Sequence, residues 1–172
     1  MEKKIQRILV RQAKLGDAHA FIKLCEAYRH ILYNSAYKIL LNDEDVADCL
    51  QETEICAWKK IGTLKNEEAF NSWIFRIMIN IAKDTLHKRV EVVEFEEKHG
   101  GVEETNYEGS DITQELNQLP EKYRIPLVLY YYAGFSIKEI AEQVGISTNT
   151  VKTRLARAKQ RLKIILEVQE NE

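Results

Sequence analysis

The sequence predicts an all-α protein made of two small helical domains joined by a flexible acidic linker. Its 172 residues include only seven glycines and two prolines, so few residues interrupt helices. Apolar side chains recur at spacings of three and four along most of the chain, which is the period of an amphipathic helix. This pattern stops between positions 91 and 111, where eight acidic residues and two adjacent glycines stand. We therefore expect domains over residues 1–90 and 112–168, with the linker over 91–111.

The first domain is expected to be a bundle of four helices. The third begins at Asn42-Asp43, where a capping side chain precedes two further acids that favour the positive end of a helix, and it ends before Gly62. The expected bounds of the four are 5–14, 21–40, 43–61 and 70–89. The apolar stripe of the fourth helix consists of Phe70, Trp73, Ile74, Ile77, Met78 and Ile81.

The second domain begins where the helical period resumes. Helices are expected over 112–119 and 121–132, and Pro120 suits the first turn of the latter. Because Pro126 removes a backbone donor inside that helix, a kink is expected there.

The last two helices are expected to be tightly connected. Ser136 and Glu139 have the spacing of a capping box, Gly145 supplies the positive φ that ends the first helix, and Ser147 caps the second. Two helices joined by such a turn are typical of the helix-turn-helix motif of DNA-binding proteins. The inward face of the second helix would consist of Val151, Leu155, Ala158 and Leu162.

The second helix of this pair is rich in cations. Six basic residues and no acid stand between positions 147 and 163. Such a helix fits a groove lined by phosphates, with its N-terminal polar side chains near base edges and its arginines near phosphates. A solvated basic face on an ordinary helix hairpin is the alternative. The candidate DNA contacts are Thr148, Asn149, Thr150, Lys152, Thr153, Arg154 and Arg157.

The formal net charge of −2 conceals an uneven distribution. Residues 1–90 carry 15 basic and 12 acidic groups, residues 91–115 carry one and nine, and residues 116–172 carry nine and six. Both domains are therefore basic, while the stretch between them is strongly acidic. Because phosphate binding depends on Lys and Arg, the near-neutral total does not argue against a nucleic-acid partner.

Several kinds of site are disfavoured by the sequence. The longest apolar run, 127–133, has seven residues against the roughly 20 that span a bilayer, and charges near the N-terminus do not fit a secretory signal. We find no Gly-rich phosphate loop and no HExxH or GxSxG motif, so no catalytic residue, cofactor, metal or small-molecule substrate is expected. Cys25, Cys49 and Cys56 are expected to be buried, reduced thiols, with zinc as an unsupported alternative.

Three segments resemble the sigma-70 family of bacterial RNA polymerase sigma factors. Region 2.2 of that family is similar to Asp45-Val46-Ala47-Asp48-Cys49-Leu50-Gln51-Glu52-Thr53 with Ala57-Trp58. Regions 2.3 and 2.4 are similar to Phe70-Asn71-Ser72-Trp73-Ile74-Phe75-Arg76-Ile77 with Asn80 and Asp84. Region 4 is similar to Leu119-Pro120-Glu121-Lys122-Tyr123-Arg124 and the helix-turn-helix. With these two regions and a linker, the chain looks like the small extracytoplasmic-function (ECF) subgroup, over about residues 10–165.

The resemblance implies a docking role for an acidic helix face. Spacings of three and four place acids on one side of the third helix, and the family docks this side on the clamp helices of the largest polymerase subunit. An ordinary solvated helix face is the alternative for any single residue. The candidate core-binding residues are Asp45, Asp48, Gln51 and Glu52.

The fourth helix and the loop before it are assigned by the resemblance to the downstream, minus ten element of the promoter. Trp73, Phe75 and Arg76 combine aromatic surface with a cation, which suits unpaired bases. Because Trp73 lies on the apolar stripe, a core position is its alternative, and Asn80 and Asp84 fit helix bracing as well as DNA contact. The candidate residues are Lys65, Asn66, Trp73, Arg76, Asn80, Lys83 and Lys88. The helix-turn-helix is assigned to the upstream, minus thirty-five element.

The resemblance also implies partners. They are core RNA polymerase, through the clamp helices of the largest subunit and the flap of the second subunit, promoter DNA, and an anti-sigma factor, which in this subgroup is often membrane-bound. The expected location is the cytoplasm, on the nucleoid with polymerase or at the membrane with an anti-sigma factor. In the family the linker threads toward the RNA exit path, whereas a solvated spacer fits the residues equally well.

Two other classes of protein fit parts of the sequence. A stand-alone helix-turn-helix repressor or activator explains residues 116–165 but leaves the motif at 45–58 without a role. A helical interaction module or enzyme subunit is disfavoured by the run of cations. We therefore expect an ECF sigma factor that directs promoter-specific initiation.

Overall fold

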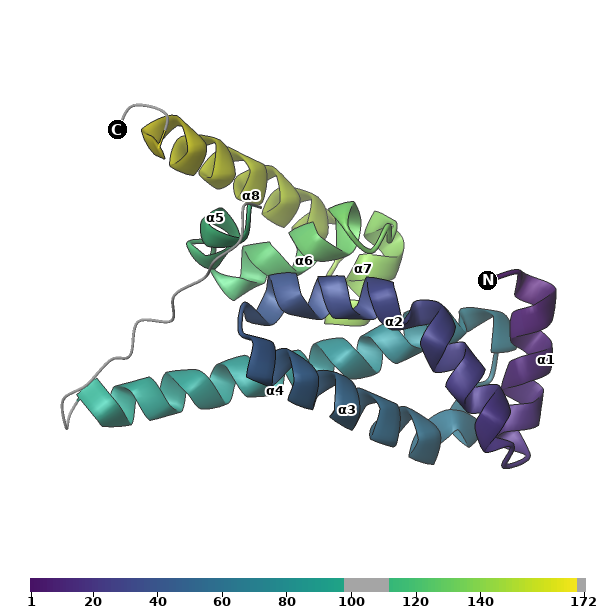
Figure 1. Ribbon diagram of the computed structural model, residues 1–172. Helices are drawn as coiled ribbons and strands as arrows, with labels where there is room; N and C mark the ends of the chain where they lie inside the picture. Colours follow the sequence, from purple (N-terminus) through teal and green to yellow (C-terminus); the bar gives the residue numbers. More distant parts are fainter. Residues whose placement is uncertain (98–111, 170–172) are drawn as a thin grey trace.

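The computed structural model describes residues 1–97 and 112–169, and the regular elements in these ranges are helical (Figure 1). This confirms the all-α class. Two short 3-10 turns, η1 (Ile61–Thr63) and η2 (Glu67–Ala69), lie in the segment before residue 70. The α-helices are α1 (Lys3–Lys14), α2 (Ala18–Leu40), α3 (Asp43–Lys60), α4 (Phe70–Glu97), α5 (Thr113–Asn117), α6 (Glu121–Tyr131), α7 (Ile137–Val144) and α8 (Thr148–Gln169).

Local capping explains where α2 and α3 begin. The Asp17 carboxylate accepts a hydrogen bond from the Ala20 amide at 3.1 Å, so α2 starts three residues before the expected position. The Asn42 side chain accepts one from the Asp45 amide at 2.9 Å, as the sequence predicts. Between the two helices, Leu41 has a φ of 56°, a left-handed conformation that ends α2 and turns the chain into α3.

Helix α4 is longer than expected. It continues to Glu97, so the prediction that the flexible linker begins at residue 91 is wrong. The reason is that Glu is a good helix former and that no Gly or Pro occurs between positions 90 and 99, so acidity alone does not end the helix. Residues 98–111, which hold the rest of the expected linker, lie outside the described residues.

The two predicted domains pack against each other. Helix α2 contacts α6 as well as α3 and α4, and α4 contacts α7 (Figure 1). Phe75 of α4 meets Phe135, which precedes α7, edge to face with ring centroids 4.9 Å apart. The Lys38 ammonium lies 4.6 Å from the centre of the Tyr132 ring. The apolar cores of the two domains are therefore continuous.

This packing buries α4 on two sides. Phe70, Ile74 and Met78 of the expected stripe are fully buried, but so are Phe75 and Ile79 on the neighbouring side. The expectation that Phe75 supplies aromatic surface for unpaired bases is therefore wrong, because its ring packs against the second domain. In the second domain, Pro126 lies inside α6, and the helix continues past it to Tyr131.

Within residues 1–97 and 112–169, no helix combines the length and the apolar composition that crossing a membrane requires.

Candidate nucleic-acid interface

The helix-turn-helix predicted from the sequence is present. Ser136 and Glu139 form the capping box of α7: the hydroxyl accepts from the Glu139 amide at 3.3 Å, and the carboxylate accepts from the Ser136 amide at 2.8 Å. Gly145 ends α7 with a φ of 70°, and the Ser147 hydroxyl accepts from the Thr150 amide at 3.1 Å at the start of α8. The predicted inward residues of α8 are all buried: Val151, Leu155, Ala158 and Leu162.

The first two turns of α8 present their polar side chains to solvent. Thr148, Asn149 and Lys152 are exposed and stand where a helix inserted into a groove meets base edges. Thr153 is also exposed, although its hydroxyl donates to the Asn149 carbonyl at 3.0 Å. Thr150 is half-buried, and its hydroxyl lies 2.8 Å from that of Ser147, so it belongs to the helix cap.

The cations farther along α8 differ in exposure, and two of them contact a tyrosine of α6. Arg154 is half-buried and Arg157 is exposed. A hydrogen bond from Arg157 lowers the pKa of the Tyr123 hydroxyl of α6, and the Arg161 guanidinium lies 5.2 Å from the same ring. Arg157 and Arg161 of α8 therefore pack against Tyr123 of α6.

The polar residues of α4 that were assigned to DNA lie along its accessible side. Arg76, Asn80 and Lys88 are exposed, and Lys83 is half-buried. Trp73 is half-buried, with its ring centroid 5.9 Å from that of Phe70, so it contributes to the core and keeps an accessible edge.

The loop 65–69, which precedes α4, is anchored by a buried residue of α1. Buried Gln6 of α1 donates from Nε2 to the Glu67 carbonyl at 2.8 Å, and its Oε1 accepts from the Tyr28 hydroxyl. The Tyr28 ring lies 5.8 Å from that of Phe70, the first residue of α4. Lys65 and Asn66 are exposed, and the Asn66 side chain accepts from the Glu68 amide at 3.0 Å. Contacts from α1 and α2 therefore anchor the loop 65–69.

The acidic face of α3 is present in part. Asp48, Gln51 and Glu52 are exposed and form one side of the helix. Asp45 is half-buried and accepts hydrogen bonds from the guanidinium of Arg89 in α4, whose Nη1 also donates to the Leu40 carbonyl at 2.8 Å. The charge of Asp45 is therefore neutralised within the molecule.

Comparison with known proteins identifies the family to which this chain belongs. The family model described as sigma-70 region 2 matches residues 24–91, and the one described as sigma-70, region 4 matches residues 110–162. The RNA polymerase sigma factor SigV of Bacillus subtilis is 32% identical over 146 residues, which cover 81% of this chain and 86% of that protein. The ECF RNA polymerase sigma factor SigW of the same organism is 29% identical over 173 residues, covering 90% and 92%. The chain belongs to the ECF subgroup of the sigma-70 family.

Two solved structures share the fold of this chain. The structure of CnrH in complex with the cytosolic domain of CnrY superposes with a TM-score of 0.74 and 26% identity, covering 95% of this chain and 98% of that one. The sigma factor RpoE of Bartonella quintana, solved with the anti-sigma factor NepR, has the same fold, with a TM-score of 0.72 and 23% identity over 85% and 98% of the chains. As an ECF sigma factor, the chain acts in transcription initiation, with α2–α4 in region 2 and α5–α8 in region 4.

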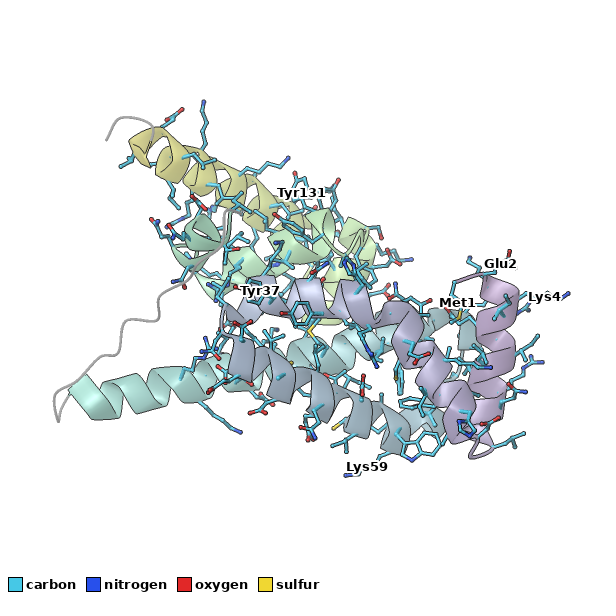
Figure 2. The ribbon with its side chains drawn as sticks, in the orientation of Figure 1. Met1, Glu2, Lys4, Tyr37, Lys59 and Tyr131 are labelled. Atoms are coloured by element: carbon cyan, nitrogen blue, oxygen red, sulfur yellow. The ribbon has the colours of Figure 1, made fainter. Side chains whose placement is uncertain are left out.

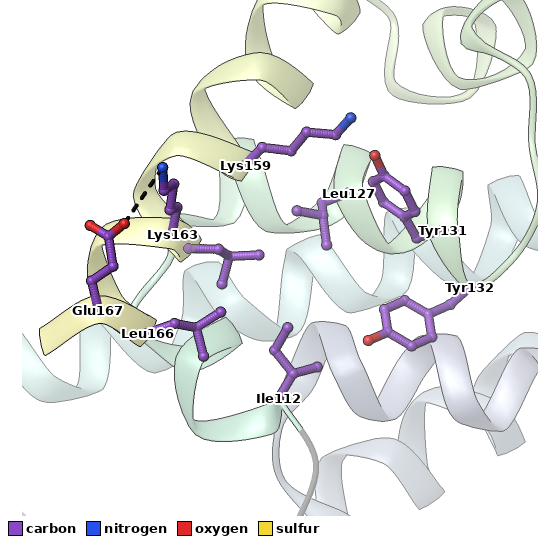
Figure 3. Close-up of a pocket in the computed structure, with 9 residues that line it drawn as sticks. Ile112, Leu127, Tyr131, Tyr132, Lys159, Lys163, Leu166 and Glu167 are labelled. Atoms are coloured by element: carbon purple, nitrogen blue, oxygen red, sulfur yellow. Dashed lines mark ion pairs between the residues drawn. The ribbon is translucent and has the colours of Figure 1, made fainter. Parts of the chain in front are cut away.

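Region 4 of this sigma factor also contains a groove that the sequence did not reveal (Figure 3). It has a volume of about 490 Å³, and Lys159 extends over it toward Tyr131 of α6, 5.4 Å from the ring centre. A hydrogen bond to Tyr131 raises the pKa of Lys159. At the rim, Lys163 pairs with Glu167 at 3.5 Å. The groove is lined by Ile112, Leu127, Tyr131, Tyr132, Lys159, Leu162, Lys163, Leu166 and Glu167.

The cysteines of the sigma factor are free thiols. Burial raises the pKa of Cys25 to about 12 and that of Cys49 to about 11, so both are protonated. The prediction that all three are buried is wrong for Cys56, which is half-exposed and donates to the Glu52 carboxylate at 3.2 Å. Its place on the polar side of α3 explains the difference.

Proposed function

We propose that this sigma factor binds core RNA polymerase and recognises promoters with two elements, α8 reading the upstream, minus thirty-five element and the loop 65–69 with α4 reading the melted downstream, minus ten element. The exposed first turn of α8 carries the proposal, because Thr148, Asn149 and Lys152 project there from a capped turn. A helix held in this way enters a major groove with polar side chains at base edges. Thr153 extends the same surface, and Arg154 and Arg157 reach phosphates.

The downstream element would be captured as a single strand. Arg76, Asn80 and Lys88 provide exposed polar and cationic groups along α4, Lys83 adds a half-buried one, and the accessible edge of Trp73 offers an aromatic surface. Stacking surfaces combined with cations suit unpaired bases. Lys65 and Asn66 bring the loop to the same strand.

The exposed side of α3 would dock on the clamp helices of the largest polymerase subunit. Asp48 and Glu52 supply negative charge, Gln51 supplies hydrogen bonds, and Ile55, which is 40% exposed, adds an apolar contact. A cationic partner surface complements this composition. Asp45 would act indirectly, by fixing α4 against α3 through Arg89.

The groove between α6 and α8 would receive the flap of the second polymerase subunit. Its floor is apolar and its rim carries Lys159 and Lys163, which suits a short amphipathic segment with acidic flanks. Tethering the chain to polymerase at both regions allows each contact to be weak by itself, since the second forms at a high effective concentration.

An anti-sigma factor would cover these surfaces when the protein is inactive. The fold shared with CnrH, solved with the cytosolic domain of CnrY, supports a partner of this kind. We propose that such a partner, bound to the membrane, withholds the sigma factor from polymerase.

Run-off transcription with purified core polymerase on a pool of genomic promoter fragments tests the proposed function. We expect promoter-specific transcripts, and we expect Asp48→Lys with Glu52→Lys to abolish core binding because two attractive charges become repulsive. Glu26→Lys with Glu54→Lys is the matched control, since these exposed acids lie on α2 and on another side of α3. Thermal unfolding shows whether each variant is folded.

Three results would contradict the proposal. The first is the absence of any promoter-specific transcript with the unmodified chain. The second is full core affinity in the Asp48 and Glu52 variant. The third is tight, sequence-specific binding of the free chain to duplex DNA without polymerase, which is the behaviour of a stand-alone regulator.

A further inference from the structure

The loop that is proposed to face the melted strand carries two acids, which is an unfavourable charge beside phosphates. Glu67 and Glu68 occupy η2, directly after Lys65 and Asn66. An uncompensated carboxylate there would repel the DNA backbone. In the structure, cations from a distant part of the sequence balance the charges of both acids.

Helix α1 places four cations against this loop. Arg11 Nε and Lys14 Nζ lie 3.6 and 3.5 Å from one carboxylate oxygen of Glu67. Arg7 Nε and Lys3 Nζ lie 3.6 and 4.0 Å from the two carboxylate oxygens of Glu68. The four residues share one side of α1, since they recur at spacings of three and four. Two negative charges thus meet four positive ones.

The same helix fixes the backbone of the loop. The side-chain amide of buried Gln6, which lies between Lys3 and Arg7 in α1, donates to the Glu67 carbonyl at 2.8 Å. Glu67 is the better enclosed of the two acids, with its side chain 22% exposed against 38% for that of Glu68. Position and charge of the loop are therefore set together.

Helix α1 ends at Lys14, before residue 24 where the match to sigma-70 region 2 begins. Helix α1, which compensates the charge of the loop, thus lies outside the matched region, whereas the loop itself lies inside that region.

We propose that α1 is a positioning and charge-neutralising element for the loop 65–69, which lets a loop with two carboxylates approach the melted promoter strand. Arg11 and Lys14 cancel the charge of Glu67, Lys3 and Arg7 cancel that of Glu68, and the net positive charge left on these four residues keeps the loop surface attractive to phosphates. This inference rests on the proposed function, which assigns the loop to DNA.

Replacement of Arg11 and Lys14 by Gln tests the inference in the full chain with core polymerase. On a promoter that the unmodified holoenzyme selects from genomic fragments, we expect transcription to fall about fivefold, the size expected for loss of partly exposed ion pairs. Adding Glu67→Gln to the same variant removes the uncompensated carboxylate, and it should restore transcription to within about twofold of the original level.

Lys4→Gln with Lys23→Gln is the matched control. It removes two cations from the same end of the molecule, and neither residue pairs with an acid in the part of the chain that the structure describes. Figure 2 shows Lys4 pointing away from the body of the molecule. The control should transcribe like the unmodified chain, and core affinity should be equal in all variants.

The inference is overturned if the Arg11 and Lys14 variant transcribes normally, if Glu67→Gln fails to rescue it, or if the control loses as much activity. Each of these results leaves promoter-specific transcription by the unmodified chain intact. Failure of the proposed function is different, because the unmodified chain would then give no promoter-specific transcript at all.

Discussion

The two regions proposed to read DNA obtain their charge in opposite ways. In region 4, α8 carries six cations between positions 147 and 163 and no acid before Glu167, so its charge follows from consecutive residues. In region 2, the loop 65–69 contains one cation and two acids, and it becomes compatible with DNA through α1, more than 50 residues earlier. The charge of one surface is a local property, whereas the charge of the other depends on the tertiary fold.

This difference predicts different vulnerabilities. Substitutions on α8 should act directly on DNA contacts and leave the rest of the molecule unchanged. Substitutions near the loop should act through the packing of α1 and α2, because Gln6, Tyr28 and Phe70 form a connected path from α1 to α4. Experiments on the two regions should separate these behaviours.

The largest effect is expected on α8. Asn149→Ala with Lys152→Ala removes two exposed polar side chains from the turn that meets base edges. Since each good base contact contributes about 1–3 kcal/mol, use of the upstream element should fall at least about tenfold. Run-off transcription from promoters with intact and altered upstream elements measures the loss.

Lys4→Ala with Gln12→Ala is the control for that prediction, because it removes similar exposed side chains from α1. Affinity for core polymerase should be unchanged in both variants. Equal use of intact and altered upstream elements by the unmodified chain would show that α8 does not read the element.

A smaller effect, on stability, is expected at Gln6. Gln6→Leu keeps the side-chain volume but leaves the Glu67 carbonyl and the Tyr28 hydroxyl without their buried partner. The free energy of unfolding should fall by about 1–3 kcal/mol. Urea unfolding measures the change, with Gln12→Leu, an exposed position on the same helix, expected to stay within about 0.5 kcal/mol of the original. A stability loss equal to that of Gln12→Leu would mean that Gln6 does not anchor the loop.

The sequence predicted best what is decided by neighbouring residues. The start of α3 follows from its cap Asn42, both ends of α7 follow from its caps Ser136 and Gly145, and the buried face of α8 follows from its period. The exposure of Asn149 and Lys152 could be predicted for the same reason. The end of α4 was missed because the expected linker was inferred from composition, while helix-forming glutamates continue the helix.

Contacts between distant segments were not predictable in this way. Asp45 has the spacing of a docking acid, but its pairing with Arg89 depends on how α3 and α4 pack. Phe75 looks like an accessible aromatic beside Arg76 until region 4 covers it. The basic row of α1 and the acid pair at 67–68 are both visible in the sequence, but complementarity of charge does not specify that they meet.

The smallest expected effect is a change in the pKa of one glutamate. It distinguishes charge that is set by neighbouring residues from charge that is set by the tertiary fold, because two glutamates with lowered pKa values can be compared in one experiment. Hydrogen bonds from the Ser136 hydroxyl and amide lower the pKa of Glu139 within its own capping box. Burial acts to raise the pKa of Glu67, but Arg11, Lys14 and a backbone hydrogen bond outweigh it and lower the value below 4.5. Neutralising Arg11 and Lys14 with Gln should therefore raise the pKa of Glu67 and leave that of Glu139 unchanged.

The side-chain carboxyl resonances of both residues, followed by NMR during an acid titration, measure these pKa values. A lowered pKa means that the folded chain binds fewer protons than the unfolded one, so the stabilisation is present above the unfolded pKa and is lost as the pH falls through the folded value. In the Arg11 and Lys14 variant, the part of this acid sensitivity that belongs to Glu67 should shrink, whereas the part that belongs to Glu139 should stay. A shift of both pKa values together would show that the variant perturbs the fold as a whole, and an unshifted Glu67 would show that its charge is compensated locally after all.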